Sequence, residues 1–147
     1  MSADLELVRA LAVEANHLAV CAVSRRDGSV HASLVSAGVL DDPFSGEPSI
    51  GVVVAGASVK LRHLRRAGRA AAVFQAGYRW VAVEGPVQLA GPDDLQLTDA
   101  SAIPGLVRAI FVAAGGQHDD WETFDRVMAD ERRAAIYIRP ERITTNG

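Results

Sequence analysis

Disulfides and membrane-spanning segments are both missing from this sequence. Its single cysteine, Cys21, cannot form a disulfide within the chain, and the apolar residues around it predict a thiol buried in the core of a reduced protein. No apolar run approaches the ~20 residues that span a bilayer. Acidic Asp4 and Glu6 stand where a signal peptide would be apolar. The sequence therefore predicts a cytoplasmic protein with no membrane partner.

A basic excess is missing as well. The 15 lysines and arginines are outnumbered by 18 aspartates and glutamates, which gives a net charge of −3 and a pI near 5.8. Domains that bind nucleic acid usually carry a large positive excess, so we expect no nucleic-acid partner. A hydrophobic content of 49% with 22% charged residues is typical of a globular protein. The length predicts a single domain over residues 1–147.

The motifs of several common catalytic machineries are absent too. No G-x-G-x-x-G follows a predicted strand, and the chain has neither a Walker A motif nor a G-x-S-x-G elbow. The four histidines are widely scattered, at positions 17, 31, 63 and 118. We therefore expect no catalytic side chain, so a bound cofactor would carry any reaction.

The stretch His118-Asp119-Asp120 contains the ligand types of a metal site. Adjacent positions at the start of a helix diverge, however, and no second cluster of ligands is visible in the sequence. Asp119 followed by Glu122 instead fits a capping box. The helix that follows would turn one stripe inward, formed by Trp121, Phe124 and Val127 or Met128. No metal site is predicted.

Apolar segments with strand periodicity set the fold class. They predict six strands, over residues 17–24, 30–40, 49–56, 69–75, 80–91 and 132–140. Asp27-Gly28 joins the first two as a hairpin, and Gly85-Pro86 predicts a bulge or an edge in the fifth. Helices are expected at residues 3–15, from Pro104 onward and within 118–131. The order predicts a mainly β (α+β) fold, an antiparallel barrel of about six strands flanked by helices.

The densest positive charge lies in Val59-Lys60-Leu61-Arg62-His63-Leu64-Arg65-Arg66. Ser58 is a favourable N-cap and Gly68 a favourable C-cap, which predicts a helix between them. On a helical wheel, Leu61 and Leu64 face one side. Four arginines face the other side, namely Arg62, Arg65, Arg66 and Arg69. We interpret these arginines as a solvated or acid-paired surface.

Lys60 differs from those arginines because it falls at the edge of the apolar face, in the first turn. A cation there opposes the helix macrodipole unless an anion compensates. The Ser58 hydroxyl, free backbone N–H groups and the Lys60 ammonium could together hold a phosphate. The side chain could equally extend past the core edge into water. The residues alone favour neither reading.

Several motifs, in this order, resemble the split β-barrel flavin/deazaflavin oxidoreductases of the pyridoxamine 5'-phosphate oxidase-like superfamily. They are the Arg26-Asp27-Gly28 hairpin, the K-x-R-x-L-R-R helix beginning at Lys60, and the W-x-x-V-E-G strand beginning at Trp80. The late segment GGQHDDWETFDRVMADERRAAIYIRPERI is similar to the branch that uses the deazaflavin coenzyme F420. The resemblance spans about Leu18 to Ile143.

The resemblance implies a split antiparallel β-barrel and a homodimer with cofactor sites at the interface. It also implies an F420-dependent reductase, which transfers hydride between deazaflavin C5 and a small electron-poor organic substrate. Lys60 would hold the cofactor phosphate, and barrel strands would border the ring. The implied cofactor-binding residues are Lys60, Ser58, Arg62, His63, Ser33, Val35, Val53, Val54, Arg79 and Trp80. Packing in the core or at an interface is an equal alternative for Trp80.

Three positions near the phosphate depart from the family's pattern, since Ser58, Leu61 and His63 stand where relatives tend to have Arg, Thr and Asn. Two alternatives to an F420-dependent enzyme therefore stay open. One is an FMN-binding oxidoreductase of the same fold. The other is a non-catalytic dimeric protein that binds a cofactor or haem.

Overall fold

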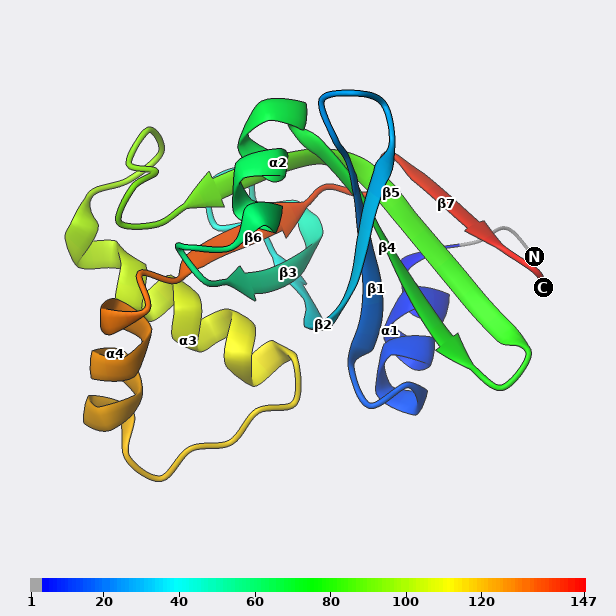
Figure 1. The fold of residues 1–147 in the computed structure, drawn as a ribbon. Helices are drawn as coiled ribbons and strands as arrows, with labels where there is room; N and C mark the ends of the chain where they lie inside the picture. Colours follow the sequence, from blue (N-terminus) through cyan, green and yellow to red (C-terminus); the bar gives the residue numbers. More distant parts are fainter. Residues whose placement is uncertain (1–3) are drawn as a thin grey trace.

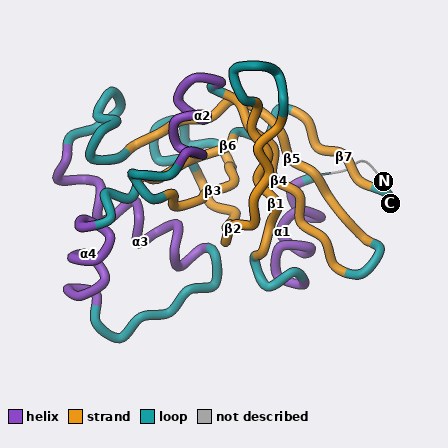
Figure 2. The backbone as a smooth tube through the Cα atoms, in the orientation of Figure 1, coloured by secondary structure: helices purple, strands orange, loops and turns teal. Residues whose placement is uncertain are grey.

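Six antiparallel strands close into a barrel in the computed structural model, which describes residues 4–147. The strands pair in the order β4-β1-β2-β3-β6-β5, and β4 also pairs with β5, which closes the ring (Figure 1, Figure 2). Their bounds are β1 Leu18–Ser24, β2 Val30–Asp41, β3 Pro48–Val54, β4 Arg69–Ala76, β5 Arg79–Ala90 and β6 Ala134–Ile138. The predicted barrel with flanking helices is therefore confirmed.

Two long strands each pair with two different neighbours along their length. β2 pairs with β1 as far as Ser36 and with β3 from Ala37 onward. β5 pairs with β4 as far as Pro86 and with β6 from Val87 onward. Gly85-Pro86, predicted as a bulge or an edge, lies where β5 changes partner within a continuous strand.

Helices α1 (Leu5–Glu14) and α2 (Val59–Ala67) lie toward opposite ends of the barrel (Figure 1). Their apolar faces share one core with the inward residues of the strands, such as Phe74 and Val81. Asp4 caps α1 by accepting from the Leu7 N–H at 3.0 Å. Residue 3, where the sequence predicted this helix to begin, lies outside the described residues. No helix within residues 4–147 is long and apolar enough to cross a membrane.

Helices α3 (Ile103–Ala113) and α4 (Trp121–Asp130) pack on one side of the barrel, α3 against β2, β3 and β6. The short 3-10 helix η1 (Ala100–Ala102) leads into α3. α3 comes unusually close to β2, because a Cβ on Gly38 would lie 2.5 Å from the carbonyl carbon of Ala113. The glycine therefore allows a backbone contact that any side chain would prevent.

Three details differ from the sequence predictions. A short strand, β7 (Arg142–Thr145), pairs with β5 outside the ring and was not predicted. The N-cap of α4 is Asp120, which accepts from the Thr123 N–H at 3.1 Å, so the capping box predicted at Asp119 is wrong. In the predicted inward stripe, Phe124 is buried, Trp121 and Met128 pack against its cluster, and only the alternative Val127 is exposed.

The close approach at Gly38 generates a stability prediction. Gly38→Ala should lower the free energy of unfolding by about 1–3 kcal/mol, because the methyl group must push α3 away from β2. Gly105→Ala is the matched control. Nothing lies within 4 Å of a Cβ at that helical position, so alanine there should stabilise by about 0.5–1 kcal/mol. Urea denaturation measures both, and equal effects would contradict the packing argument.

Candidate functional site

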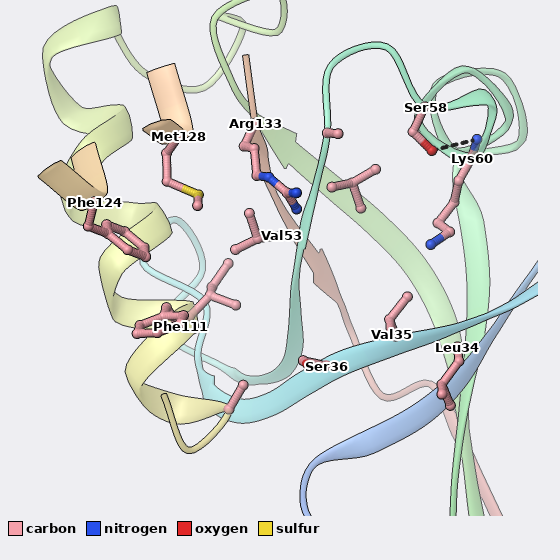
Figure 3. Close-up of a pocket in the computed structure, with 14 residues that line it drawn as sticks. Leu34, Val35, Ser36, Val53, Ser58, Lys60, Phe111, Phe124, Met128 and Arg133 are labelled. Carbon is pink, nitrogen blue, oxygen red and sulfur yellow. Dashed lines mark hydrogen bonds between the residues drawn. The ribbon is translucent and has the colours of Figure 1, made fainter. Parts of the chain in front are cut away.

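A pocket of about 490 Å³ opens between the barrel and helices α2, α3 and α4 (Figure 3). The described residues that line it include no aspartate, glutamate, histidine or cysteine. The strands contribute Leu34, Val35 and Ser36 from β2 and Val53 and Val54 from β3, followed by Ala55. The helices contribute Lys60 from α2 with its N-cap Ser58, Ile110 and Phe111 from α3 followed by Ala114, and Phe124 and Met128 from α4. Arg133, before β6, completes the lining.

Lys60 supplies an unpaired positive charge at one edge of this pocket. Figure 3 shows its ammonium directed away from α2 toward the side of β2 that carries Leu34 and Val35. Among the described residues, no ion pair includes it. The sequence placed Lys60 at the edge of the buried face of its helix. In the structure this side chain extends into the pocket.

Ser58 sits beside that charge as the predicted N-cap of α2, and the helix ends at the predicted Gly68 with φ 67°. Its hydroxyl oxygen accepts from the Lys60 N–H at 3.1 Å (Figure 3). One backbone donor expected to be free for a phosphate is thus already used. The hydroxyl hydrogen of Ser58 remains available to donate.

Cys21, Ser33 and His31 share the inward-facing side of β1 and β2, and His31 lies next to His63 of α2. Cys21 is buried as predicted, and burial raises the pKa of its thiol despite an opposing effect from Lys60. A neutral thiol of this kind is a weak nucleophile, which agrees with a core role. Ser33 pairs directly with Cys21 across β1 and β2, and its buried hydroxyl has no hydrogen-bond partner among the described residues.

The structure brings together five of the ten predicted cofactor-binding residues, namely Ser58, Lys60, Val35, Val53 and Val54. Arg62 and His63 line a separate hollow with Arg26 and Arg66. Ser33, Arg79 and Trp80 also lie outside the pocket lining.

Arg79 forms an ion pair with Glu14 at 3.4 Å. The Trp80 backbone N–H donates to Asn146 Oδ1 at 3.1 Å, which ties the tryptophan to the C-terminal strand. The roles of Arg79 and Trp80 as cofactor contacts stay predictions.

Sequence reasoning missed the wall of the pocket that α3, α4 and the following loop supply. Phe111 and Phe124 pack with ring centroids 4.8 Å apart and ring planes tilted by 49°, and Met128 continues this apolar wall. Arg133 adds a second cation (Figure 3). Its Nε donates to Glu131 Oε1 at 2.7 Å. The inward stripe predicted for α4 was the only signal in the sequence that pointed to this wall.

The arrangement suits a ligand that combines an anionic group with a flat apolar part. A free ammonium and a hydroxyl lie at one edge, and aliphatic or aromatic walls form most of the rest. The described lining residues include no carboxylate, imidazole or thiol, so none of these common acid–base groups is available for proton transfer here. Binding, orientation and exclusion of water are what these residues can provide.

Solved structures with the same fold were found, although no protein-family model and no curated protein matches the sequence. A conserved hypothetical protein of Mycobacterium tuberculosis is 18% identical with a TM-score of 0.69, covering 99% of this chain and 85% of that one. A pyridoxamine 5'-phosphate oxidase-related, FMN-binding protein of Nostoc punctiforme is 10% identical with a TM-score of 0.65, covering 99% and 84%. A protein described as an F420 reductase is 14% identical with a TM-score of 0.59, covering 88% and 90%. The chain therefore shares the antiparallel split-barrel fold of these structures.

The unpartnered hydroxyl of Ser33 generates a prediction for the unliganded protein. Ser33→Ala should raise the free energy of unfolding by about 1 kcal/mol, because a buried hydroxyl without a partner is desolvated at a cost. Ser49→Ala is the control, since the Ser49 hydroxyl donates to the Leu40 carbonyl at 2.9 Å and its loss should destabilise by a similar amount. Chemical denaturation of both variants checks the opposite signs.

Proposed function

We propose that this protein is an oxidoreductase that binds coenzyme F420 in the pocket beside Lys60 and passes hydride between the cofactor and a small electron-poor organic substrate. The observation that carries the proposal is the unpaired Lys60 ammonium at the edge of a largely apolar pocket, whose described lining residues include no carboxylate, imidazole or thiol. A deazaflavin supplies the hydride chemistry itself, at C5 of its ring. The protein then needs only to hold the ring, orient it and exclude water.

Each part of the pocket has a role under this proposal. Lys60 attracts the cofactor phosphate, and the Ser58 hydroxyl donates a hydrogen bond to it. Val53 of β3 offers an apolar surface to the ring, and Val54 lines the pocket from the opposite face of the same strand. Phe111 and Phe124 face this surface from α3 and α4 and keep water from the space between.

FMN is the second candidate cofactor, because it too joins a phosphate to a flat ring. A neighbour of the same fold is described as FMN-binding. The same pocket residues would contact either molecule, so the choice is made by direct comparison of their affinities.

Binding of the two cofactors to the purified protein tests the proposal. Titration with coenzyme F420, followed by fluorescence quenching, should give saturable binding that is tighter than the binding of FMN. Lys60→Ala should weaken F420 binding about 10- to 100-fold, because it removes a charge-assisted hydrogen bond worth about 1.5–3 kcal/mol. Arg126→Ala, on the exposed side of α4, removes an equal charge away from the pocket and should leave the affinity unchanged.

Two outcomes would count against this function. Absence of saturable binding to either cofactor would favour the non-catalytic alternative. Equal weakening by Lys60→Ala and Arg126→Ala would mean that the cofactor responds to net charge and does not sit beside Lys60.

We further propose that the functional unit is a homodimer in which a second copy covers the outer face of strands β1, β2 and β4. Val20 on β1 pairs with Leu34 on β2 and with Val73 on β4, so these three side chains form an apolar row on that face. Val20 and Leu34 are 42% and 65% exposed in the single chain. Leu34 also lines the pocket, so a partner on this face would lie next to the cofactor site.

A charge placed in this apolar row should prevent association. Val20→Asp should convert a dimer into a monomer in light scattering coupled to size-exclusion chromatography, because burying an unpaired carboxylate is costly. Val13→Asp, at a site on α1 that is 65% exposed, should leave the dimer intact. A monomeric wild-type protein, or a dimer unaffected by Val20→Asp, would refute this interface.

A further inference from the structure

The helical wheel placed the arginines of α2 on one common face. In the structure they fall into two groups, because some pair with acidic residues and others do not. Arg65 makes two hydrogen bonds to Asp94, at 2.7 and 2.8 Å, and Asp94 is nearly buried. Arg69, just after the helix, pairs with Glu141 at 2.6 Å. Arg62 and Arg66 take part in none of the ion pairs within residues 4–147.

The two arginines without acidic partners face the tip of the β1–β2 hairpin, which lies beside α2 (Figure 1). A hollow of about 300 Å³ lies between hairpin and helix, and its lining is entirely basic. Arg26 of the tip lines it together with Arg62, His63 and Arg66 of α2. We call this feature the hairpin–helix hollow.

The hairpin–helix hollow is held open by contacts that leave its charges unneutralised. The Arg66 guanidinium donates to the Ser24 carbonyl, which fixes the helix to the end of β1. Arg25, also at the tip, donates to the Val30 carbonyl at 2.8 Å. Both contacts use neutral acceptors, so the positive charge stays uncompensated.

The one carboxylate of the tip, Asp27, is occupied within the turn. The Ser29 N–H and hydroxyl both donate to Asp27 Oδ1, at 3.0 and 2.6 Å. These hydrogen bonds lower the pKa of Asp27, with a smaller contribution from Arg25. Asp27 therefore remains charged but is engaged in the turn and is not among the residues that line the hollow.

Crowding of like charges is visible at His63. Its ring lies 5.7 Å from that of His31 on β2. Partial burial lowers the pKa of His63, and His31, Arg25, Arg66 and Arg62 lower it further. A bound anion would reverse the electrostatic part of this effect, so binding should be accompanied by proton uptake.

We propose that the hairpin–helix hollow binds a small polyanion with closely spaced phosphate groups, such as the di- or triphosphate of a nucleotide or free polyphosphate. Guanidinium groups match phosphate oxygens through paired N–H donors, and three arginine side chains line one small hollow. The size of the hollow suits two or three linked phosphates and excludes a folded partner. This site goes beyond the proposed oxidoreductase function and does not depend on it.

The hollow and the cofactor pocket share no lining residue, although both use α2. Lys60 and Ser58 face the pocket, whereas Arg62, His63 and Arg66 face the hairpin. Substitutions on the two sides can therefore separate the two sites.

Isothermal titration calorimetry with tripolyphosphate, at an ionic strength of ~0.15 M to screen diffuse attraction, tests the site. We expect one ligand per chain. The double variant Arg26→Ala/Arg62→Ala should weaken binding at least about 30-fold, because two charge-assisted contacts are lost and neither arginine makes a hydrogen bond in the unliganded structure. The control Arg9→Ala/Arg126→Ala removes the same charge from exposed positions on α1 and α4 and should stay within about twofold of wild type.

Three further measurements test the preference for phosphate, the location of binding and the response of His63. Citrate should bind at least about tenfold more weakly than tripolyphosphate, since it has fewer oxygen acceptors and a lower charge density. Lys60→Ala should leave tripolyphosphate binding unchanged, whatever it does to cofactor binding. In an NMR titration, tripolyphosphate should raise the pKa of His63.

Several results would overturn the site. They are a lack of saturable binding, equal losses in the two double variants, equal affinity for citrate, or loss of binding in Lys60→Ala. A His63 resonance that titrates identically with and without tripolyphosphate would also refute it. None of these results bears on whether F420 binds the pocket.

Discussion

Closure of the barrel depends on two strands that each bond to two different neighbours. The first part of β2 belongs to the sheet with β1, and its second part belongs to the sheet with β3. β5 does the same between β4 and β6. A strand can change neighbours only where the sheet curls, so these two changes bring β4 and β5 together and remove two free edges. The candidate pocket lies beside the change in β2, where Leu34, Val35 and Ser36 line it.

The part of β2 where the partner changes also determines how closely α3 approaches the barrel. Gly38 follows directly after the change of partner in β2 and allows α3 to approach the strand. α4 is fixed to α3 by hydrogen bonds between Arg108 and Asp125, and Phe111 and Phe124 pack between the two helices. The apolar wall of the pocket is therefore a consequence of backbone packing at one glycine. The wall thus depends on how α3 packs on the barrel.

The features that the sequence predicted correctly depend on residues close together in the chain. Ser58 caps α2 with its side chain and Gly68 caps it with its backbone, so the limits of the helix and the edge position of Lys60 followed from local rules. β7 has only four residues and depends on pairing with distant β5, so no local pattern indicated it. Asp119 and Asp120 are both good caps, and only the path of the loop decides between them. Arg133 reaches the pocket because α4 returns the chain to β6, which spacing alone could not indicate.

The firm attachment of α2 has a kinetic consequence. Leu61 and Leu64 anchor the helix in the core, the Arg65–Asp94 pair holds its outer side, and Arg66 ties it to β1. The backbone that carries Lys60 is therefore in place before any ligand arrives. Encounter with an anion would need only a rotamer adjustment of one lysine, which takes nanoseconds or less. Association should then proceed as a single bimolecular phase whose rate falls with added salt, without a slow first-order step.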